Sequence, residues 1–326
     1  MVQLSVLDLA YIGEGFTPAD ALTNALDLAQ HVEASGFKRF WMAEHHNLAG
    51  IASAATSVCM CHVAGGTKTI RIGAGGIMLP NHSPMIVAEQ FGTLATLFPG
   101  RIDLGLGRAP GTDQHTLNAL RRAPDSSEYF PQDVVELKAL LGPPQENQTI
   151  HAIPGEDTNV PLWILGSSLF GAQLAAMLGL PFAFASHFAP QALMQAVSIY
   201  RERFEPSAQL DKPYVMVGCN VIVSDTEDEA RRIFTTPQQN VIRMVRGTRG
   251  QLPPPVDDIE KIWSPMEKSQ ASSMLACSFY GSTETIKSKL VPLIESTDAD
   301  ELMVAAAIWD HKTRVHSFEL LAQAMR

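Results

Sequence analysis

The sequence alternates short apolar segments with longer amphipathic ones almost throughout, and this alternation constrains the fold more than any other feature. Short apolar runs predict strands that are buried on both faces, and the segments between them predict helices that cover a parallel sheet. Eight strand–helix units in regular succession favour an α/β fold of the closed (β/α)8 TIM-barrel type over the main alternative, an open doubly wound sheet. We predict strands near residues 3–8, 38–42, 69–74, 101–106, 161–165, 181–185, 214–223 and 300–305. We predict helices near residues 18–35, 52–64, 84–97, 131–141, 168–178, 190–204, 226–235, 283–294 and 314–325.

Two polar stretches interrupt this alternation and predict insertions after strand 4 and after strand 7. The first covers residues 111–129, and the second covers residues 237–276 and includes three consecutive prolines. Long connections between barrel strands are usually functional or mobile, so we interpret the second insertion as a lid or wall over the barrel mouth. An α/β barrel commonly reaches this length as one unit, and we therefore predict a single domain over residues 1–326.

Charge and composition bear on the partners and the compartment of the protein. The net charge of −10 and the pI of about 5.4 argue against nucleic acid or an anionic membrane as the main partner. The first residues are typical of a strand and not of a signal peptide, and prolines and glycines break the uncharged stretch 160–186 into strand, helix and strand. The four cysteines fit free thiols in a reducing compartment, so we predict a cytoplasmic location. They are Cys59, Cys61, Cys219 and Cys277.

Ionisable residues follow the second predicted strand, at the end where a parallel barrel carries its chemistry. These residues are Glu44, His45 and His46. A histidine at a barrel mouth can move protons near neutral pH, although a pair of hydrogen-bonded loop histidines would give the same pattern. The segment has no third ligand at a spacing typical of metal sites, and Cys59 and Cys61 face apart on a helix. We therefore predict no metal site.

Glycines end the third and fourth predicted strands. The third strand runs into Gly75 and Gly76, and the fourth runs into Gly105 and Gly107. A glycine has no Cβ, so a flat ligand can lie directly on the backbone at such positions. The fourth strand does not carry a dinucleotide-binding fingerprint, because Pro110 stands where that motif needs its third glycine.

Two further segments predict a phosphate site. Arg108 follows the fourth strand and can bind phosphate through two parallel hydrogen bonds, although a structural pair with Asp103 or Asp113 is an alternative. Ser167 and Ser168 stand at a predicted helix start, where unpaired N–H groups and hydroxyls can surround an anion, although simple helix capping is equally consistent. Together with the glycines, these residues suit a phosphorylated flavin.

The chain resembles the luciferase-like flavin monooxygenases, the relatives of bacterial luciferase. The resemblance runs from about Leu4 to the C-terminal helix and looks closest to a single-subunit bacterial subgroup. Its most specific parts are Glu44-His45-His46, 73–80, 99–101 with 105–108, and 165–171. It implies a (β/α)8 barrel, reduced FMN supplied by a separate flavin reductase, and activation of O₂ as a flavin C4a-hydroperoxide.

The resemblance also implies roles for individual residues. His45 aligns with the catalytic histidine of the family and Arg108 with its phosphate-binding arginine, and the phosphate-binding helix start aligns with Ser167, Ser168 and Gly171. Gly75 and Gly76 occupy the place of a non-prolyl cis peptide behind the flavin ring. Gly107 stands where luciferase has a reactive cysteine, so this position cannot act through a thiol.

We therefore predict a two-component FMN-dependent monooxygenase that oxygenates a small organic substrate. The predicted catalytic residues are His45, Glu44 and His187, the last of which follows the sixth strand. The predicted cofactor-binding residues are Gly75, Gly76, Gly107, Arg108, Ser167, Ser168 and Gly171. The predicted substrate pocket consists of the apolar residues Leu7, Met42, Met78 and Phe188.

Two alternative functions remain open at this point. A deazaflavin-dependent oxidoreductase would use the same barrel, but the anionic tail of that cofactor needs a basic groove, and the chain has 24 basic residues against 34 acidic ones. A flavin-binding protein without turnover is the other alternative. The Glu44-His45-His46 segment argues mildly for catalysis.

The predicted partners are O₂, the organic substrate, a transiently bound flavin reductase and a second copy of the chain. The predicted helix at 52–64 contains no Asp, Glu, Lys or Arg, although an outer barrel helix should have a solvated face. Small side chains would also let a partner helix approach closely. We therefore expect a homodimer built on the helices at 52–64 and 84–97, which the resemblance also indicates.

Overall fold

The computed structural model describes residues 2–109 and 113–326. In this part of the chain, eight parallel strands close into a barrel in the order β1-β2-β3-β4-β5-β6-β7-β9, with β9 paired to β1. A further strand, β8, pairs with β7 outside the barrel. The strands are β1 Gln3–Asp8, β2 Arg39–Met42, β3 Arg71–Met78, β4 Ile102–Gly107, β5 Leu162–Gly166, β6 Phe182–Phe184, β7 Val215–Val223, β8 Ser278–Gly281 and β9 Glu301–Ala305.

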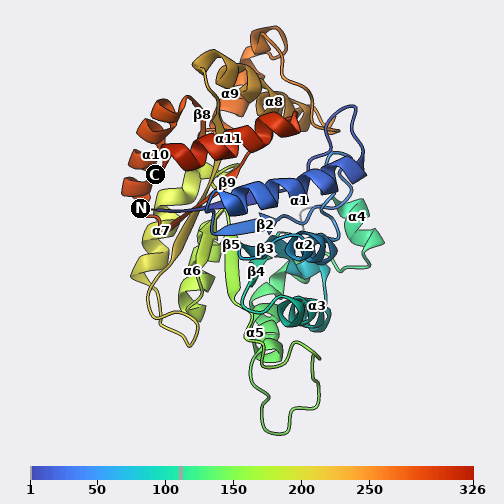
Figure 1. Cartoon of the computed structure of the whole chain (residues 1–326). Coiled ribbons are helices and arrows are strands. Elements are labelled where there is room, and N and C mark those ends of the chain that lie inside the picture. The colour runs from blue at the N-terminus through green and yellow to red at the C-terminus, as the bar shows by residue number, and fades with distance from the viewer. Residues whose placement is uncertain (1, 110–112) are drawn as a thin grey trace.

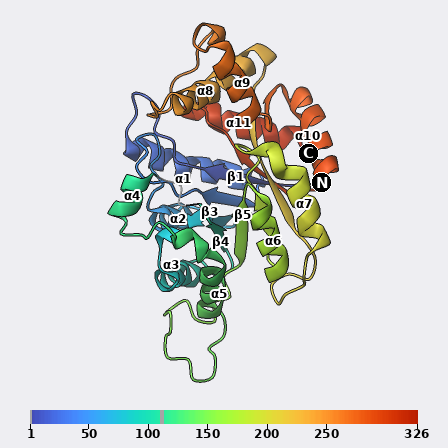
Figure 2. The same ribbon diagram turned by 180° about the vertical axis from the view of Figure 1, so that it is seen from behind.

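Helices surround the barrel, as Figures 1 and 2 show from opposite sides. They are α1 Pro18–Ala34, α2 Thr56–Gly65, α3 Pro84–Leu97, α4 Gln114–Ala119, α5 Phe130–Leu141, α6 Leu169–Leu178, α7 Leu193–Glu202, α8 Glu227–Val245, α9 Pro265–Met274, α10 Thr283–Thr297 and α11 His311–Ala324. Short 3₁₀ turns are η1 Leu79–Asn81, η2 Ser126–Glu128, η3 Pro190–Ala192 and η4 Ile259–Lys261. None of the described helices is long and apolar enough to cross a lipid bilayer.

The predicted barrel and its two insertions are confirmed, but the bounds of two elements differ clearly from expectation. β3 continues to Met78 instead of ending at residue 74, so Gly75 and Gly76 lie within the strand. The helix predicted at 52–64 begins only at Thr56, because the Ser53 hydroxyl bonds the carbonyls of Leu9 and Ala43 and holds the preceding segment against two barrel loops. Residues 110–112, where the first insertion begins, lie outside the described part of the chain.

The second insertion contains more regular structure than its composition predicts. α8 continues through Pro237 to Val245, and it is followed by α9 and by strand β8, which the sequence analysis missed. A proline removes one helical hydrogen bond. In α8 the buried side chains of Phe234 and Ile242, on either side of the proline, hold both halves against the protein. The insertion also pairs with the loop after β1, where Leu252 N–H donates to the carbonyl of Ile12 at 2.8 Å.

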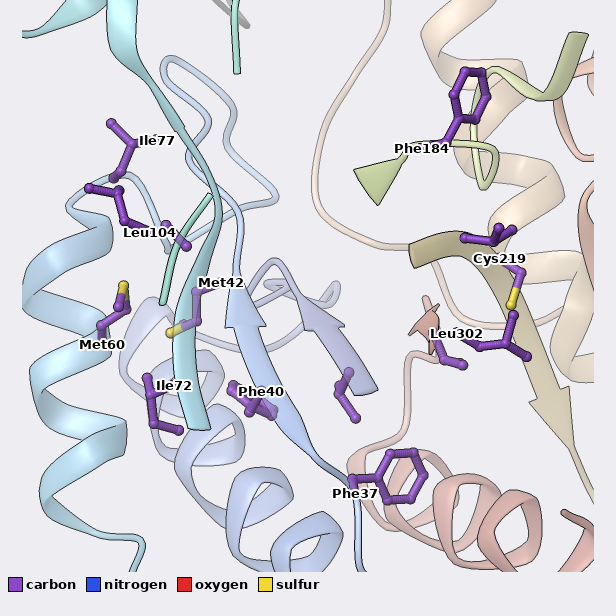
Figure 3. Close-up of a cluster of buried hydrophobic side chains, with 14 of the residues drawn as sticks. Phe37, Phe40, Met42, Met60, Ile72, Ile77, Leu104, Phe184, Cys219 and Leu302 are labelled. Atoms are coloured by element: carbon purple, nitrogen blue, oxygen red, sulfur yellow. The ribbon is translucent and has the colours of Figure 1, made fainter. Parts of the chain in front are cut away.

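Alternation along the strands separates two apolar layers. Phe40 and Met42 point from β2 toward the helices, where Figure 3 shows them with Met60 and Ile72. Trp41 points the other way, into the barrel. Met42 therefore does not line the barrel mouth, and its assignment to the substrate pocket is wrong. Strand periodicity predicts this result once the face of Trp41 is known, because successive side chains lie on opposite faces.

A buried network of charges closes the N-terminal end of the barrel. The Asp103 carboxylate accepts from Arg39 Nη1 at 2.6 Å and from Arg71 Nη2 at 2.6 Å, and Arg39 Nε donates to Glu301 at 3.0 Å. Asp103 and Glu301 are fully buried. Although burial lowers the pKa of Arg39, the two carboxylates raise it above its ordinary value. The network therefore closes this end of the barrel with paired, buried charges, and we call Arg39, Arg71, Asp103 and Glu301 together the charged floor.

Candidate active site at the barrel mouth

The strand register brings the predicted site segments to one end of the barrel. Met78 of β3 is level with Gly107 of β4, and Gly107 is level with Leu165 of β5. Gly166 is in turn level with Phe184 of β6. The segments that follow these strands therefore meet around the barrel mouth, although they come from distant parts of the sequence.

The lower part of the barrel interior is filled, so a ligand has room only above it. The rings of Trp41 and Trp163 pack edge to face with centroids 5.1 Å apart, and Trp163 packs in the same way on Tyr214 at 5.5 Å. Leu7 and Met303 belong to the same cluster. Smaller residues of this cluster are Ala43 directly after β2, Ala183 in the middle of β6 and Ala305 at the end of β9.

Gly75 and Gly76 form a backbone shelf above this filled layer. The peptide bond between them is cis, as the resemblance implied. A Cβ on Gly76 would lie 2.7 Å from the Gly105 carbonyl oxygen, and a Cβ on Gly75 would lie 2.6 Å from the Leu7 side chain. Gly76 therefore has no space for a side chain, because the obstructing atom belongs to the backbone, whereas a side chain at Gly75 would have to displace the flexible end of Leu7.

Gly107 differs from these two glycines because it borders open space. A Cβ there would meet no atom closer than the Ile77 carbonyl oxygen, at 3.7 Å. The end of β4 thus leaves room above the backbone beside the glycine shelf. This geometry suits a flat group that lies against β3 and β4.

The start of α6 and Arg108 form a corner suited to an anion. Ser168 occupies the N-cap position of α6, but its hydroxyl makes no capping hydrogen bond, so the N-cap side chain does not occupy the first-turn N–H groups. The guanidinium carbon of Arg108 lies 4.2 Å from the ring centroid of Phe170, the second residue of the same helix. Ser167 and Arg108 are exposed. A cation and an uncapped helix N-terminus therefore lie side by side.

Two alternatives were open for these residues: an ion pair of Arg108 with Asp103 or Asp113, and simple capping of the helix by the serines. Neither describes the observed contacts. Asp103 binds Arg39 and Arg71, and Asp113 caps α4 and accepts from Asn47.

Gly171 has a packing role, since it is buried and its Cβ position lies 3.3 Å from the Gly166 Cα atom. It lets α6 start close to β5.

Two histidines lie near one another at the mouth. His45 follows β2 and His187 follows β6, and both are half-buried. Burial lowers the pKa of His187 to about 4, and a smaller contribution comes from the charge of His45. His187 is therefore neutral at neutral pH. Its Nδ1 atom is buried without a hydrogen-bond partner among the described residues, and its ring packs edge to face on Phe188.

Glu44 is the anchor of the segment that carries His45. Its carboxylate is 1% exposed and accepts from His46 Nε2 at 2.6 Å, from His82 Nε2 at 2.8 Å and from the Met78 N–H at 3.0 Å. Although burial raises the pKa of Glu44, the bonds from these three groups hold it below its ordinary value. These contacts support a positioning role for Glu44, while a direct catalytic role stays a prediction.

His82 is the member of this group that sequence reasoning missed. It follows the 3₁₀ turn η1, 36 positions after His46, so no local spacing joins the two histidines. Only the pairing of β2 with β3 brings them to the same carboxylate.

Three of the four residues predicted for the substrate pocket do lie at or below the mouth. Leu7 is buried beneath Gly75, Met78 is half-buried at the end of β3, and Phe188 is exposed beside His187. Met42 lies outside this set, as described above. Contact of the substrate with Leu7, Met78 and Phe188 stays a prediction.

The model of a known family matches residues 2–254, and its description is luciferase-like monooxygenase. The chain belongs to the luciferase-like monooxygenase family. Similar relatives include a luciferase-like monooxygenase of Escherichia coli, 51% identical over 98% of this chain and 96% of the relative. The N-acetyl-S-alkylcysteine monooxygenase of Bacillus subtilis is 30% identical over 100% of this chain and 98% of the relative. This chain is accordingly a flavin-dependent monooxygenase.

Solved structures of luciferase-like barrels agree with this assignment. The crystal structure of apo-MsnO8 is 32% identical, has a TM-score of 0.88, and covers 100% of this chain and 98% of the other. More distant structures show the shared fold. One is the oxygenating constituent of 3,6-diketocamphane monooxygenase in complex with FMN, with 15% identity and a TM-score of 0.72 over 99% of this chain and 97% of the other. Another is a secondary alcohol dehydrogenase that depends on coenzyme F420, a deazaflavin, with 16% identity and a TM-score of 0.72 over 100% of this chain and 99% of the other.

Proposed function

We propose that this luciferase-like monooxygenase is the oxygenase of a two-component system that receives reduced FMN from a separate flavin reductase. The observation that carries the proposal is the uncapped N-terminus of α6 with Arg108 beside it, next to the glycine shelf. An anion at a helix N-terminus is stabilised by the free N–H groups and by the helix dipole. One phosphate group, at the end of a flat ring system, matches this arrangement.

Each part of the mouth then has a role toward the cofactor. Arg108 and the exposed Ser167 and Ser168 bind the phosphate, while the backbone of Gly75–Gly76 and the open space at Gly107 receive the ring. Reduced FMN supplies the electrons that activate O₂. The protein supplies orientation, proton control and a site from which water is excluded.

The apolar side chains favour a small organic molecule as the substrate. Leu7 lies below the shelf, and Met78 and Phe188 lie at the edge of the mouth. His45 holds or moves the proton needed at the reacting centre. His187 stays neutral beside it, because burial lowers its pKa.

FMN is favoured over a deazaflavin by the charge of the mouth. A deazaflavin cofactor carries a longer anionic tail, which needs several cations, while Arg108 is the cation that borders the α6 start. The solved neighbours include proteins with either cofactor, so we infer FMN from this chain's own residues. Titrating the protein with each cofactor in parallel tests the choice, and tighter deazaflavin binding would reverse it.

Replacing Arg108 by alanine is expected to weaken FMN binding at least tenfold, or about 1.4 kcal/mol. The reason is the loss of a charge-assisted contact to the phosphate. The measurement is a fluorescence titration of FMN with the purified protein. Arg246→Ala is the matched control, since Arg246 is exposed and pairs with Glu267 in the second insertion. Equal FMN affinity in folded Arg108→Ala and in the wild type would refute the phosphate assignment.

We further propose that the protein is a homodimer that pairs through α2 and α3. Val58 on α2 and Ile86 and Leu97 on α3 are exposed apolar residues, and burying them against a second copy is favourable. Light scattering at micromolar concentration should give twice the chain mass of 35.4 kDa. Val58→Lys combined with Leu97→Lys should give a monomer of unchanged secondary structure. A wild-type mass of one chain would exclude this dimer.

A further inference from the structure

Glu44, His46 and His82 form a compact group of potential metal ligands at the barrel mouth. Each offers one ligand atom, and all three atoms lie within 4.8 Å of one another. Both imidazoles approach the same carboxylate oxygen, with Nε2 to Oε1 distances of 2.6 Å from His46 and 2.8 Å from His82. The group thus combines two nitrogen donors and one carboxylate from two separate loops.

The donor set suits a divalent transition-metal ion. Imidazole and carboxylate ligands bind Zn²⁺, Co²⁺, Ni²⁺ and Cu²⁺, and three protein ligands with open positions are typical of accessible zinc sites. Ligand atoms about 2.0–2.1 Å from a tetrahedral ion lie about 3.3 Å apart. The two Nε2–Oε1 separations are slightly shorter, so a small outward movement of each imidazole from the carboxylate would admit the ion.

The surroundings hold the carboxylate and leave the imidazoles accessible. The Met78 N–H fixes the second carboxylate oxygen of Glu44 at 3.0 Å, which is the type of supporting contact that orients metal ligands. The Glu44 side chain is 1% exposed, while those of His46 and His82 are 18% and 29% exposed. An ion can therefore approach from solvent on the imidazole side.

We propose that Glu44, His46 and His82 bind one divalent transition-metal ion of the zinc class at the barrel mouth. The three ligands are different residues from those that form the phosphate corner, Arg108 and the start of α6. Since His45 lies between two of the ligands in the sequence, a bound ion holds the backbone on both sides of it. The site therefore couples metal occupancy to the segment that we assign to proton control.

Titration of the full-length, FMN-free protein with Co²⁺ tests the proposal. The protein is first treated with a chelator, and the visible absorption of tetrahedral or five-coordinate Co²⁺ is then followed. We expect one bound ion per chain, displaced by Zn²⁺. His46→Ala and His82→Ala should each weaken Co²⁺ binding at least about tenfold, because loss of a ligand exceeds the effect of losing a supporting contact.

Two further variants make the result specific. His316→Ala removes an exposed histidine that lies 3.0 Å from Asp225 and should leave Co²⁺ binding unchanged. Glu44→Gln keeps the size of the side chain but removes its charge, and it should weaken binding like the histidine variants. No Co²⁺ binding by the wild type, or binding that is equal in wild type, His46→Ala and His82→Ala, would overturn the proposal. Neither result depends on FMN, so the test is separate from that of the proposed function.

Discussion

Replacing His45 by alanine is expected to shorten about hundredfold the time over which protein-bound reduced FMN resists reoxidation by O₂. His45 follows β2 directly beside the shelf, where the Glu44 N–H approaches the Gly76 carbonyl at 3.4 Å. The neighbouring His187 is neutral, because burial lowers its pKa to about 4, so His45 is the group placed to hold a proton. The measurement is stopped-flow absorbance of the flavin, after a solution of reduced FMN with excess protein is mixed with oxygenated buffer.

The affinity for FMN separates this role from a structural one. His45→Ala should bind FMN as tightly as the wild type, since the phosphate corner is unchanged. His316→Ala, on the surface of α11, serves as the control and should behave as the wild type in both assays. Reoxidation at the wild-type rate in His45→Ala would remove His45 from the proposed mechanism. A loss of FMN affinity equal to that of Arg108→Ala would instead assign it to binding.

Replacing Asp103 by alanine is expected to reduce the free energy of unfolding by about 3–5 kcal/mol, because it leaves buried positive charge without a partner. Asp103 is fully buried and neutralises both Arg39 and Arg71, at 2.6 Å from each. After the substitution, Glu301 is the remaining carboxylate of this network that is bonded to Arg39. The measurement is urea unfolding of each variant. The shift of the urea midpoint gives the change in the free energy of unfolding, provided that the dependence of that free energy on urea concentration has the same slope in the variants.

A matched aspartate on the surface controls for the substitution itself. Asp228 pairs with Arg231 at 2.9 Å, but both side chains are exposed, and such pairs contribute little. Asp228→Ala should therefore leave the urea midpoint nearly unchanged. If Asp103→Ala does not fold, Asp103→Asn keeps the shape of the side chain and still removes the charge. Equal midpoints for Asp103→Asn, Asp228→Ala and the wild type would contradict the charged-floor interpretation.

The residues of the sequence alone were sufficient for the barrel and for the location of its mouth. Apolar strands in regular alternation with helices predict a parallel sheet covered on both faces, and eight such units in regular succession favour its closure into a barrel, as observed. Strand ends are readable locally, since glycines, serines and charged residues interrupt the apolar runs. For this reason the segments at 44–46, 75–76, 105–108 and 167–168 could be assigned to one end of the barrel before its structure was known.

The faces of side chains and the ends of elements were less well determined. Met42 was assigned to the mouth because it ends a strand, but the pleat places it toward the helices and places Trp41 inside. The polar stretch that starts at residue 237 predicts a helix that ends near residue 235, yet tertiary packing of α8 on both sides of Pro237 outweighs the lost hydrogen bond. Strand β8 is hard to recognise in the sequence because it has only four residues and directly follows the polar second insertion, so only its pairing with β7 identifies it.

The partners of each charged group were decided by the tertiary structure alone. Asp103 was a candidate partner for Arg108, but the barrel closes around it and brings Arg39 and Arg71 to its carboxylate. His82 joined Glu44 and His46 only through the pairing of neighbouring strands. Local sequence indicates approximately where each strand lies along the chain, since that depends on neighbouring residues. Which charges meet depends on distances between strands that only the closed barrel sets.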